Sequence, residues 1–416
     1  MNVLYLLYDG LTDSLGRSQV LPYILGLKEI GHKFTIVSCE KPERFQQDKE
    51  NIQRIVDEAG IKWVPLIYTS SPPVLSTIFD VWQLRKTAET LNKETPFDIV
   101  HCRSYITSLV GLVMKQKHGT KFIFDMRAFY ADERVDGKLW NLRNPVFKSV
   151  YNYFKRKEIE FLTEADHSIS LTSKGKEIIR TWNHIPNQPI PVEVIPCCAD
   201  LNHFHPSKID ISLQTQLTAR FGLGEDDFVI TYLGSIGTWY LLDEMLDFFK
   251  VLVQKRPKSK FLFITTDEPD TILNPAKAIG IPADKLLISP AKREEVPTFL
   301  SLAKAAIFFI QPVFSKSGSS PTKHGEMLGM GLPVIANAGV GDVDSIIEDT
   351  NSGILIKEFS PEAYQKAVDQ IDDLLEIPTD TLQAAANKYY SLEEGVKRYN
   401  SVYERISGGT SRSEES

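Results

Sequence analysis

Residues 314–337 read FSKSGSSPTKHGEMLGMGLPVIAN and combine a polar loop, a short helix and a strand. The first half is rich in Ser, Gly and Lys, so we expect it outside the core. Ser320 then predicts a helix N-cap and Pro321 the first helical position, where the missing N–H group costs nothing. Gly329 and Gly331 end the helix, and the apolar residues after them predict a buried strand.

The start of this predicted helix is a candidate anion site. Its free N–H groups and the positive end of its dipole point toward any ligand in the serine-rich loop. Lys323 adds a positive charge beside Thr322, and Glu326 lies on the same helix face. A lysine that binds phosphate and a glutamate that binds hydroxyls would together hold a nucleotide's phosphates and ribose. A surface ion pair between Lys323 and Glu326 is the alternative interpretation.

Length and composition indicate an ordinary globular protein. The chain has 416 residues, a length sufficient for two domains with separate cores. Its residues are 42% hydrophobic and 24% charged, as in ordinary soluble globular proteins. The net charge of −7 argues against a general nucleic-acid binder. The four cysteines lack metal-ligand spacing, which predicts reduced thiols in a cytoplasmic protein. We expect neither a signal peptide nor a transmembrane helix, and we expect a disordered tail at 407–416.

Apolar, β-branched runs alternate with helix-length segments along the chain. This alternation predicts an α/β protein with parallel sheets covered on both faces. The predicted strands are residues 3–8, 34–38, 98–102, 122–126, 168–171 and 192–196 in a first set, and 229–233, 261–265, 286–289, 306–310, 333–336 and 354–356 in a second. We therefore expect two Rossmann-like domains, a linker near 200–221, and a ligand site in the cleft between the domains.

Residues 321–336 resemble the donor-site helix of retaining GT-B glycosyltransferases of family 4, in which a Glu precedes a small-residue, Gly, Pro, Val pattern. The resemblance implies that Glu326 binds the donor ribose and that the loop with Lys323 binds the pyrophosphate. It also implies a GT-B fold, with two Rossmann-like domains facing across a cleft. We expect the acceptor-side domain at 1–200 plus a C-terminal helix at 390–406, and the donor-binding domain at 205–389.

A glycine-containing turn follows the first strand of each predicted domain. The turn at residues 9–20 resembles the family's N-domain glycine loop, in which Gly16 would allow close backbone approach to a ligand. The turn with Gly234 and Gly237 would lie beneath the donor. A simple strand-to-helix turn is the alternative for the first of these loops.

The second glycine turn departs from the family pattern. Many members carry an Arg just after the first Gly and a Lys a few residues later, but here Ser235 and Trp239 stand nearest to those positions. Neutralisation of the pyrophosphate must then come from Lys323, from backbone N–H groups or from Arg127 across the cleft.

A second departure concerns the family's first glutamate. The motif places two Glu residues with seven between them, and Gly318 stands eight positions before Glu326. The carboxylate that usually contacts the transferred sugar is therefore missing. Ser317, Ser319 or Ser320 would supply hydroxyl contacts instead.

Charged and aromatic residues interleave just past the predicted strand at 122–126. We expect Arg127 to face phosphate or sugar as a catalytic group, and Asp132 or Glu133 to receive acceptor hydroxyls. A solvated loop is the competing interpretation. Further on, residues 138–161 predict a helix packed on the first domain. Its aromatic and basic residues also suit an anionic membrane surface, which would serve a lipid-linked acceptor.

The resemblance implies a metal-independent, retaining glycosyltransferase without a cofactor. Its donor would be a nucleotide-diphosphate sugar, and its acceptor a glycan, a lipid-linked molecule or a small molecule. We expect no nucleic-acid partner, since the chain is acidic. A role in polysaccharide or glycoconjugate synthesis follows. A GT-B nucleotide-sugar epimerase and a non-catalytic nucleotide-binding partner subunit are the two alternatives.

Overall fold

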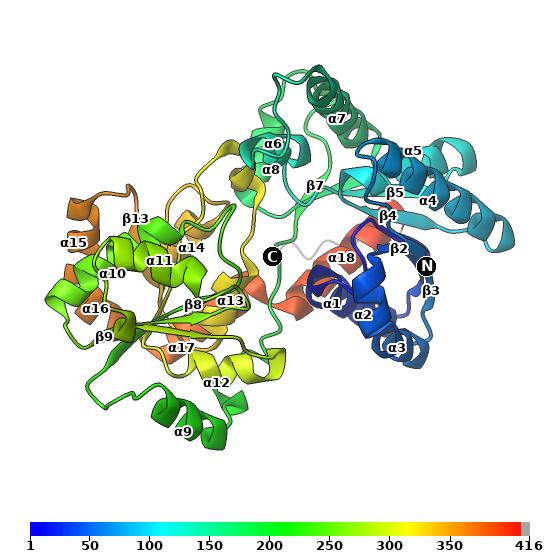
Figure 1. Ribbon diagram of the computed structural model, residues 1–416. Helices are drawn as coiled ribbons and strands as arrows, with labels where there is room; N and C mark the ends of the chain where they lie inside the picture. Colours follow the sequence, from blue (N-terminus) through cyan, green and yellow to red (C-terminus); the bar gives the residue numbers. More distant parts are fainter. Residues whose placement is uncertain (409–416) are drawn as a thin grey trace, which may run out of the picture. The chain divides into compact units, whose positions relative to one another are not determined.

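The computed structural model describes residues 1–408, which divide into two compact units (Figure 1). Unit 1 combines Met1–Pro196 with the chain from Leu392, and unit 2 comprises Cys197–Ser391. The linker predicted near 200–221 is wrong, because these residues lie within unit 2 and form part of its structure. Most of the tail predicted at 407–416 lies outside the described residues.

Unit 1 contains a parallel sheet with strand order β3-β2-β1-β4-β5-β6-β7. Its strands are β1 (Asn2–Leu7), β2 (Lys33–Glu40), β3 (Lys62–Ile67), β4 (Ile99–Arg103), β5 (Lys121–Asp125), β6 (His167–Ser170) and β7 (Val192–Val194). The sequence analysis missed β3, which contains Pro65. Proline cannot donate to a ladder, but β3 lies at the sheet edge, where this loss is tolerated.

Helices cover the unit 1 sheet, and Figure 1 shows α4 and α5 side by side. The helices are α1 (Ser14–Gln19), α2 (Leu21–Glu29), α3 (Pro42–Glu58), α4 (Leu75–Glu94), α5 (Ser104–His118), α6 (Tyr130–Asp136), α7 (Pro145–Glu164), α8 (Ser173–Arg180) and α18 (Leu392–Ile406). The expected helix at 138–161 begins later, at Pro145, because the Asn144 side chain caps it by accepting from Val146 N at 2.9 Å.

The C-terminal helix α18 belongs to unit 1, as the resemblance implied. Two of its tyrosines reach buried polar groups of the sheet. Tyr399 donates to Asp125 at 3.0 Å, and the Tyr403 hydroxyl lies 2.7 Å from His101 Nδ1. The helix therefore supplies hydrogen-bond partners to Asp125 and His101, which are buried in the complete unit.

Unit 2 contains a second parallel sheet with strand order β10-β9-β8-β11-β12-β13. Its strands are β8 (Phe228–Leu233), β9 (Ser259–Ile264), β10 (Leu286–Ser289), β11 (Ala305–Phe308), β12 (Val334–Asn337) and β13 (Gly353–Ile356). All six overlap the strands predicted from the sequence. In both sheets the order reverses beside the first strand of the unit, which is where doubly wound sheets bind ligands.

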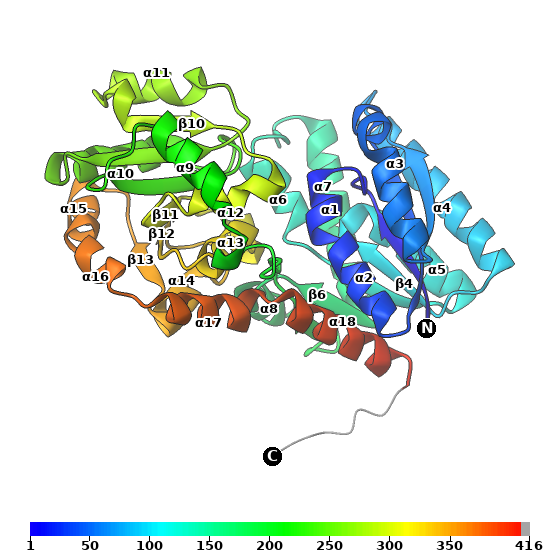
Figure 2. The same cartoon turned by 90° about the horizontal axis from the view of Figure 1, so that it is seen from below.

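The helices of unit 2 pack around this sheet, and Figure 2 shows α14 and α17 beside one another. The α-helices are α9 (Ile211–Arg220), α10 (Leu242–Lys255), α11 (Asp270–Ala278), α12 (Val296–Leu300), α13 (Thr322–Gly329), α14 (Val343–Thr350), α15 (Pro361–Asp369), α16 (Ile371–Leu375) and α17 (Thr379–Tyr390). Short 3-10 helices are η1 (Pro206–Lys208), η2 (Ala283–Lys285), η3 (Arg293–Glu295) and η4 (Phe314–Gly318).

Each unit has its own hydrophobic core of buried aliphatic and aromatic side chains. Among residues 1–408, no helix is both long enough and apolar enough to cross a membrane. All four cysteines are buried. Across the same described residues, no cluster of three or more His, Cys, Asp or Glu side chains could bind a metal ion.

Candidate active site

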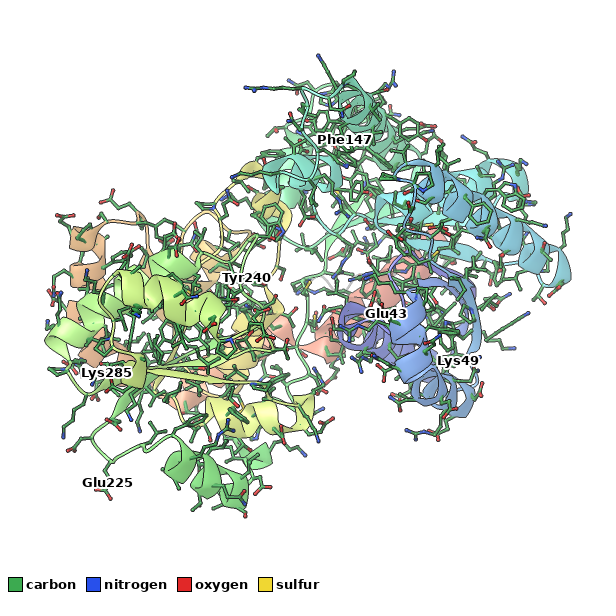
Figure 3. The ribbon with its side chains drawn as sticks, viewed as in Figure 1. Glu43, Lys49, Phe147, Glu225, Tyr240 and Lys285 are labelled. Atoms are coloured by element: carbon green, nitrogen blue, oxygen red, sulfur yellow. The ribbon has the colours of Figure 1, made fainter. Side chains whose placement is uncertain are left out.

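Lys323 lies in the first turn of α13, where it is only 8% exposed. Its Nζ donates to the Tyr232 hydroxyl at 3.1 Å and lies 3.6 Å from the centre of the Tyr240 ring. Figure 3 marks Tyr240 in unit 2. Burial lowers the Lys323 pKa to about 7, against the opposing effect of Glu326. A buried ammonium held mainly by aromatic rings has much to gain from an anionic ligand.

Glu326 follows one turn later on the same helix and is partly buried. Burial raises its pKa to about 7, while Arg293 and then Lys323 act in the opposite direction. In the described part of the chain, no ion pair joins Lys323 to Glu326, so the surface ion-pair interpretation is wrong. Arg293, whose side chain also approaches Asp200 at 3.7 Å, is a further positively charged neighbour of Glu326.

The glycine turn after β8 lies directly against Lys323. Gly234 has φ of +120°, and a Cβ added there would stand 3.1 Å from Lys323 Nζ. The Tyr232 hydroxyl that accepts from Lys323 donates in turn to the Ser235 carbonyl at 2.6 Å. Gly237 also has a positive φ of +100°, but a Cβ there would meet nothing within 4 Å. Lys323 and the predicted residues Gly234 and Ser235 therefore form one local cluster, and Gly237 follows them in the same turn.

Asp267 fixes this turn from the next strand, and the sequence analysis missed it. Its carboxylate accepts from the Ile236 backbone N–H and from the Thr265 hydroxyl, the latter at 2.9 Å. The available signal was its position just after β9, because polar residues at the carboxyl ends of parallel strands commonly face a ligand site.

The serine-rich segment before α13 is not the exposed loop that we predicted. Residues 314–318 form η4, in which Ser315, Lys316, Ser317 and Gly318 are buried. Small side chains allow this close packing, and Gly341 N donates to the Lys316 carbonyl at 2.8 Å. Composition alone therefore misjudged the burial of this segment.

Lys316 is a second buried lysine that the sequence analysis did not single out. It is 6% exposed, and its Nζ lies 3.7 Å from the centre of the Trp239 ring. Trp239 occupies the position at which many family members were expected to carry a lysine. An ammonium group is thus present at this turn, although it comes from another segment of unit 2.

The predicted helix cap is also wrong, by one residue. Helix α13 begins at Thr322, with Pro321 as its N-cap and no capping side chain. Ser320 instead accepts a hydrogen bond from Cys197 N at 3.2 Å. Ser319 ends η4 and is partly exposed. The first backbone N–H groups of α13 consequently remain without a side-chain cap, as an anion site requires.

Gly16 in unit 1 is required by the protein's own packing, and its approach to a ligand stays a prediction. It lies inside α1, and a Cβ there would stand 2.2 Å from the Gly10 carbonyl oxygen. The close approach is thus to the protein's own backbone. The missed residue Glu40 secures the same turn, because its buried carboxylate accepts from Leu11 N at 2.8 Å and Thr12 N at 3.2 Å.

Arg127 lies two residues past the end of β5, and its side chain is 10% exposed. Its guanidinium lies 3.7 Å from Asp125, a fully buried carboxylate. Burial opposes ionisation of Asp125, but the Arg127 charge and the bond with His101 outweigh it and lower the pKa to about 2. Arg127 has φ of +59° and Ala128 has φ of +125°. Strained backbone at two successive residues is typical of functional sites.

Asp132 and Glu133 lie in the first turn of α6, so the interpretation of this segment as a solvated loop is wrong. Asp132 accepts from the Tyr151 hydroxyl and from Lys155 Nζ, each at 2.9 Å. This network binds α6 to α7. Glu133 is partly exposed. The structure brings both residues to one helix turn, and their role toward an acceptor stays a prediction.

Solved structures with the same architecture cover almost the whole chain. Sucrose-phosphate synthase from Thermosynechococcus elongatus superposes with a TM-score of 0.71 at 13% identity, covering 99% of this chain and 100% of that one. HepE from Anabaena, in complex with UDP-glucose, superposes with a TM-score of 0.68 at 13% identity, covering 98% and 100%. The fold is therefore the GT-B fold of two Rossmann-like domains, as predicted.

Two family models match the chain in succession. "Glycosyltransferase Family 4" matches residues 21–203, and "Glycosyl transferases group 1" matches residues 214–389. The protein belongs to the group 1 family of GT-B glycosyltransferases. A D-inositol 3-phosphate glycosyltransferase from Streptomyces scabiei is 21% identical over 301 residues, which cover 70% of this chain. The chain spans 63% of the length of that relative.

Proposed function

We propose that this protein transfers a sugar from a nucleotide-diphosphate sugar to a hydroxyl acceptor with retention of anomeric configuration. Unit 2 would bind the donor, and unit 1 would supply acceptor contacts. The observation that carries the proposal is the placement of Lys323. It is a buried ammonium at an uncapped helix start, against a glycine turn, without an ion pair to Glu326.

This arrangement favours departure of a diphosphate. As the bond from the anomeric carbon to the phosphate oxygen breaks, negative charge grows on the leaving group. Lys323 and the first N–H groups of α13 would stabilise that charge more strongly in the transition state than in the ground state. The acceptor oxygen forms the new bond on the same face, and its proton passes to the departing phosphate. No nucleophilic side chain is needed in these reaction steps.

The remaining residues take supporting roles in the proposal. Glu326 would bind the ribose hydroxyls, and the backbone around Gly234 and Ser235 would bind phosphate oxygens. Lys316 would supply part of the charge that family members obtain from the substituted positions. Arg127 would bind phosphate or sugar from unit 1, and independence of a divalent metal is part of the same proposal.

The physiological setting is proposed from the sequence and its relatives. The reaction would take place in the cytoplasm, in the synthesis of a polysaccharide or glycoconjugate. HepE was solved with UDP-glucose, which makes UDP the first nucleoside diphosphate to test. The name of the Streptomyces relative adds an inositol phosphate to the acceptors worth screening.

Calorimetric binding of UDP, GDP, ADP and TDP, with and without Mg²⁺, tests the donor site. We expect one diphosphate to bind without metal, and Lys323→Met to weaken it at least a hundredfold. Lys277→Ala, which alters an exposed lysine of α11, is the matched control. If no diphosphate binds, or if Lys323→Met binds as well as wild type, the donor-site assignment is wrong.

Two further measurements separate the alternative functions. A nucleotide-sugar epimerase would interconvert sugars when incubated with the donor alone, whereas a transferase needs an acceptor. A non-catalytic partner subunit is motivated by Gly318, Ser235 and Trp239, which replace expected charged residues. It would bind nucleotide without turnover until a second chain was added.

A further inference from the structure

A pocket of about 730 Å³ opens in unit 1, beside the carboxyl ends of β1, β3 and β5. Its volume lies in the range typical of small-molecule sites, about 300–1,000 Å³. Helices α4 and α7 supply much of its wall, through residues such as Ile78, Val81, Phe147 and Val150. Figure 3 marks Phe147 on α7. The lining is mainly aliphatic and aromatic, which suits a hydrocarbon ligand.

The start of α4 exposes apolar side chains and buries a charged one, which is the reverse of the usual pattern. Leu75, Ile78 and Trp82 are 63%, 60% and 54% exposed, and Phe79 stacks on Trp82 at the surface. On the opposite face Asp80 is buried, where it accepts from the Tyr8 hydroxyl at 3.0 Å. A helix that buries a carboxylate and exposes an apolar row has an unsatisfied hydrophobic surface.

The opposite side of the pocket is apolar and exposed as well. Leu139 is 55% exposed, Val146 is 56% exposed and Tyr153 is 39% exposed, and Leu139 and Tyr153 line the pocket itself. Large exposed hydrophobic side chains of the described residues thus gather on both walls of one concave site. Such a patch marks a ligand or interaction site on a protein surface.

Positive charges accompany these apolar side chains. Arg134 lies in the pocket wall, with its guanidinium 5.0 Å from the centre of the Tyr130 ring. Outside the pocket lining, Lys86 Nζ lies 5.2 Å from the Trp82 ring, and Lys157 Nζ lies 6.0 Å from the Tyr153 ring and 2.7 Å from Glu160 Oε2. Although the chain carries a net charge of −7, its apolar pocket is bordered by cations. Aromatic rings beside Lys and Arg are the chemistry that receives an anionic amphiphile.

From these observations, we infer that the pocket binds the hydrocarbon chain of a lipid phosphate, with Arg134 on the phosphate group. The inference rests on the proposed function for one point only, namely that this lipid is the acceptor or carries it. It selects the lipid-linked class among the acceptors that the sequence left open. The apolar walls hold the chain, and Arg134 in the wall favours an anionic rather than a neutral lipid.

Binding of farnesyl monophosphate and dimethylallyl monophosphate, below micelle-forming concentrations, tests the site. The two probes share a phosphate and differ by ten carbons. Each fully buried methylene contributes about a fourfold gain in affinity, so we expect farnesyl monophosphate to bind at least a hundredfold more tightly. Equal affinity for the two probes would overturn the inference.

Three variants locate the binding. Ile78→Asp and Val150→Asp are expected to weaken farnesyl monophosphate at least tenfold and to leave the short probe unchanged. Arg134→Gln is expected to weaken both probes by the same factor, about tenfold, because it removes a phosphate contact. Ile211→Asp is the control, since Ile211 is 67% exposed in unit 2. A matching loss in that control would overturn the assignment.

Two further measurements distinguish this inference from the proposed donor site and from a dimer interface. Nucleoside diphosphate binding to unit 2 tests the proposed function, so nucleotide binding without lipid binding defeats the pocket assignment alone. Lipid binding without nucleotide binding leaves the pocket in place and defeats the donor site. Sedimentation of the Ile78→Asp variant covers the remaining case. A shift from dimer to monomer without any lipid binding by wild type would assign the patch to a second copy of the chain.

Discussion

At the scale of single residues, Lys323 and Glu326 give the site an unusual dependence on pH. Both pKa values lie near 7, one lowered from 10.5 and the other raised from 4.5, chiefly by burial. Between pH 4.5 and 7 the folded Glu326 holds a proton that the unfolded chain has released, so its contribution to stability falls as pH rises. Between pH 7 and 10.5 the unfolded Lys323 holds the extra proton, so its contribution rises. Together they predict a stability minimum near pH 7.

The same lysine couples diphosphate binding to proton uptake. At pH 8 most Lys323 side chains are neutral in the free protein, and a bound diphosphate raises the lysine pKa. Binding should then take up close to one proton, and affinity should fall as pH rises from 7 to 9. Calorimetry in two buffers of different ionisation enthalpy measures the uptake. Loss of uptake in Lys323→Met is required, and unchanged uptake would contradict this assignment.

The glycine turn offers a matched pair of substitutions. Gly234→Ala and Gly237→Ala both place an alanine at positive φ, which costs about 1–3 kcal/mol. Only the first brings a Cβ to 3.1 Å from Lys323 Nζ. We expect both variants to lose similar stability, and Gly234→Ala alone to weaken diphosphate binding more than tenfold. Equal binding by the two variants would show that the turn and Lys323 act independently.

At the scale of elements, the turn after β1 depends on Glu40 from β2. Leu11 N and Thr12 N donate to different oxygens of Glu40, so Glu40→Gln places an N–H donor against one of these two N–H groups. We expect the free energy of unfolding to fall by about 1–3 kcal/mol in denaturant titrations. Glu43→Gln, at an exposed position of α3, should change it by less than about 0.5 kcal/mol. A similar loss in both variants would remove the special role of Glu40.

Elements were predictable where the apolar pattern was strong and local. All unit 2 strands carry such runs, and each was found at nearly its observed place. The strand β3 was missed because Pro65 interrupts its pattern. Residues 314–318 were misplaced because their burial depends on contacts with residues such as Trp239 and Gly341, which no local pattern contains. Lys323 was identifiable from the motif, whereas its contacts with Tyr232 and Tyr240 could be seen only in the folded structure.

At the scale of the whole molecule, the chain crosses from unit 1 into unit 2 and returns. A chain ending at Ser391 lacks α18, so Asp125 loses the Tyr399 hydroxyl and His101 loses the Tyr403 hydroxyl. We expect unit 1 of this truncated chain to unfold at lower denaturant concentration, while diphosphate binding to unit 2 persists. Fluorescence titration and calorimetry measure the two effects separately. Tyr399→Phe should reproduce part of the destabilisation, and a full loss of nucleotide binding on truncation would contradict the division.

The return of the chain through α18 also orders events during synthesis. The ribosome completes the unit 1 strands at Val194, but it must add all of unit 2 before it reaches Leu392. At about 5–20 residues per second, that delay is roughly 10–40 s. Throughout it, the groove that α18 will fill stays open, with Asp125 and His101 exposed to solvent or to a chaperone. Unit 2 has no such wait, so the second unit to emerge is the first that can be finished.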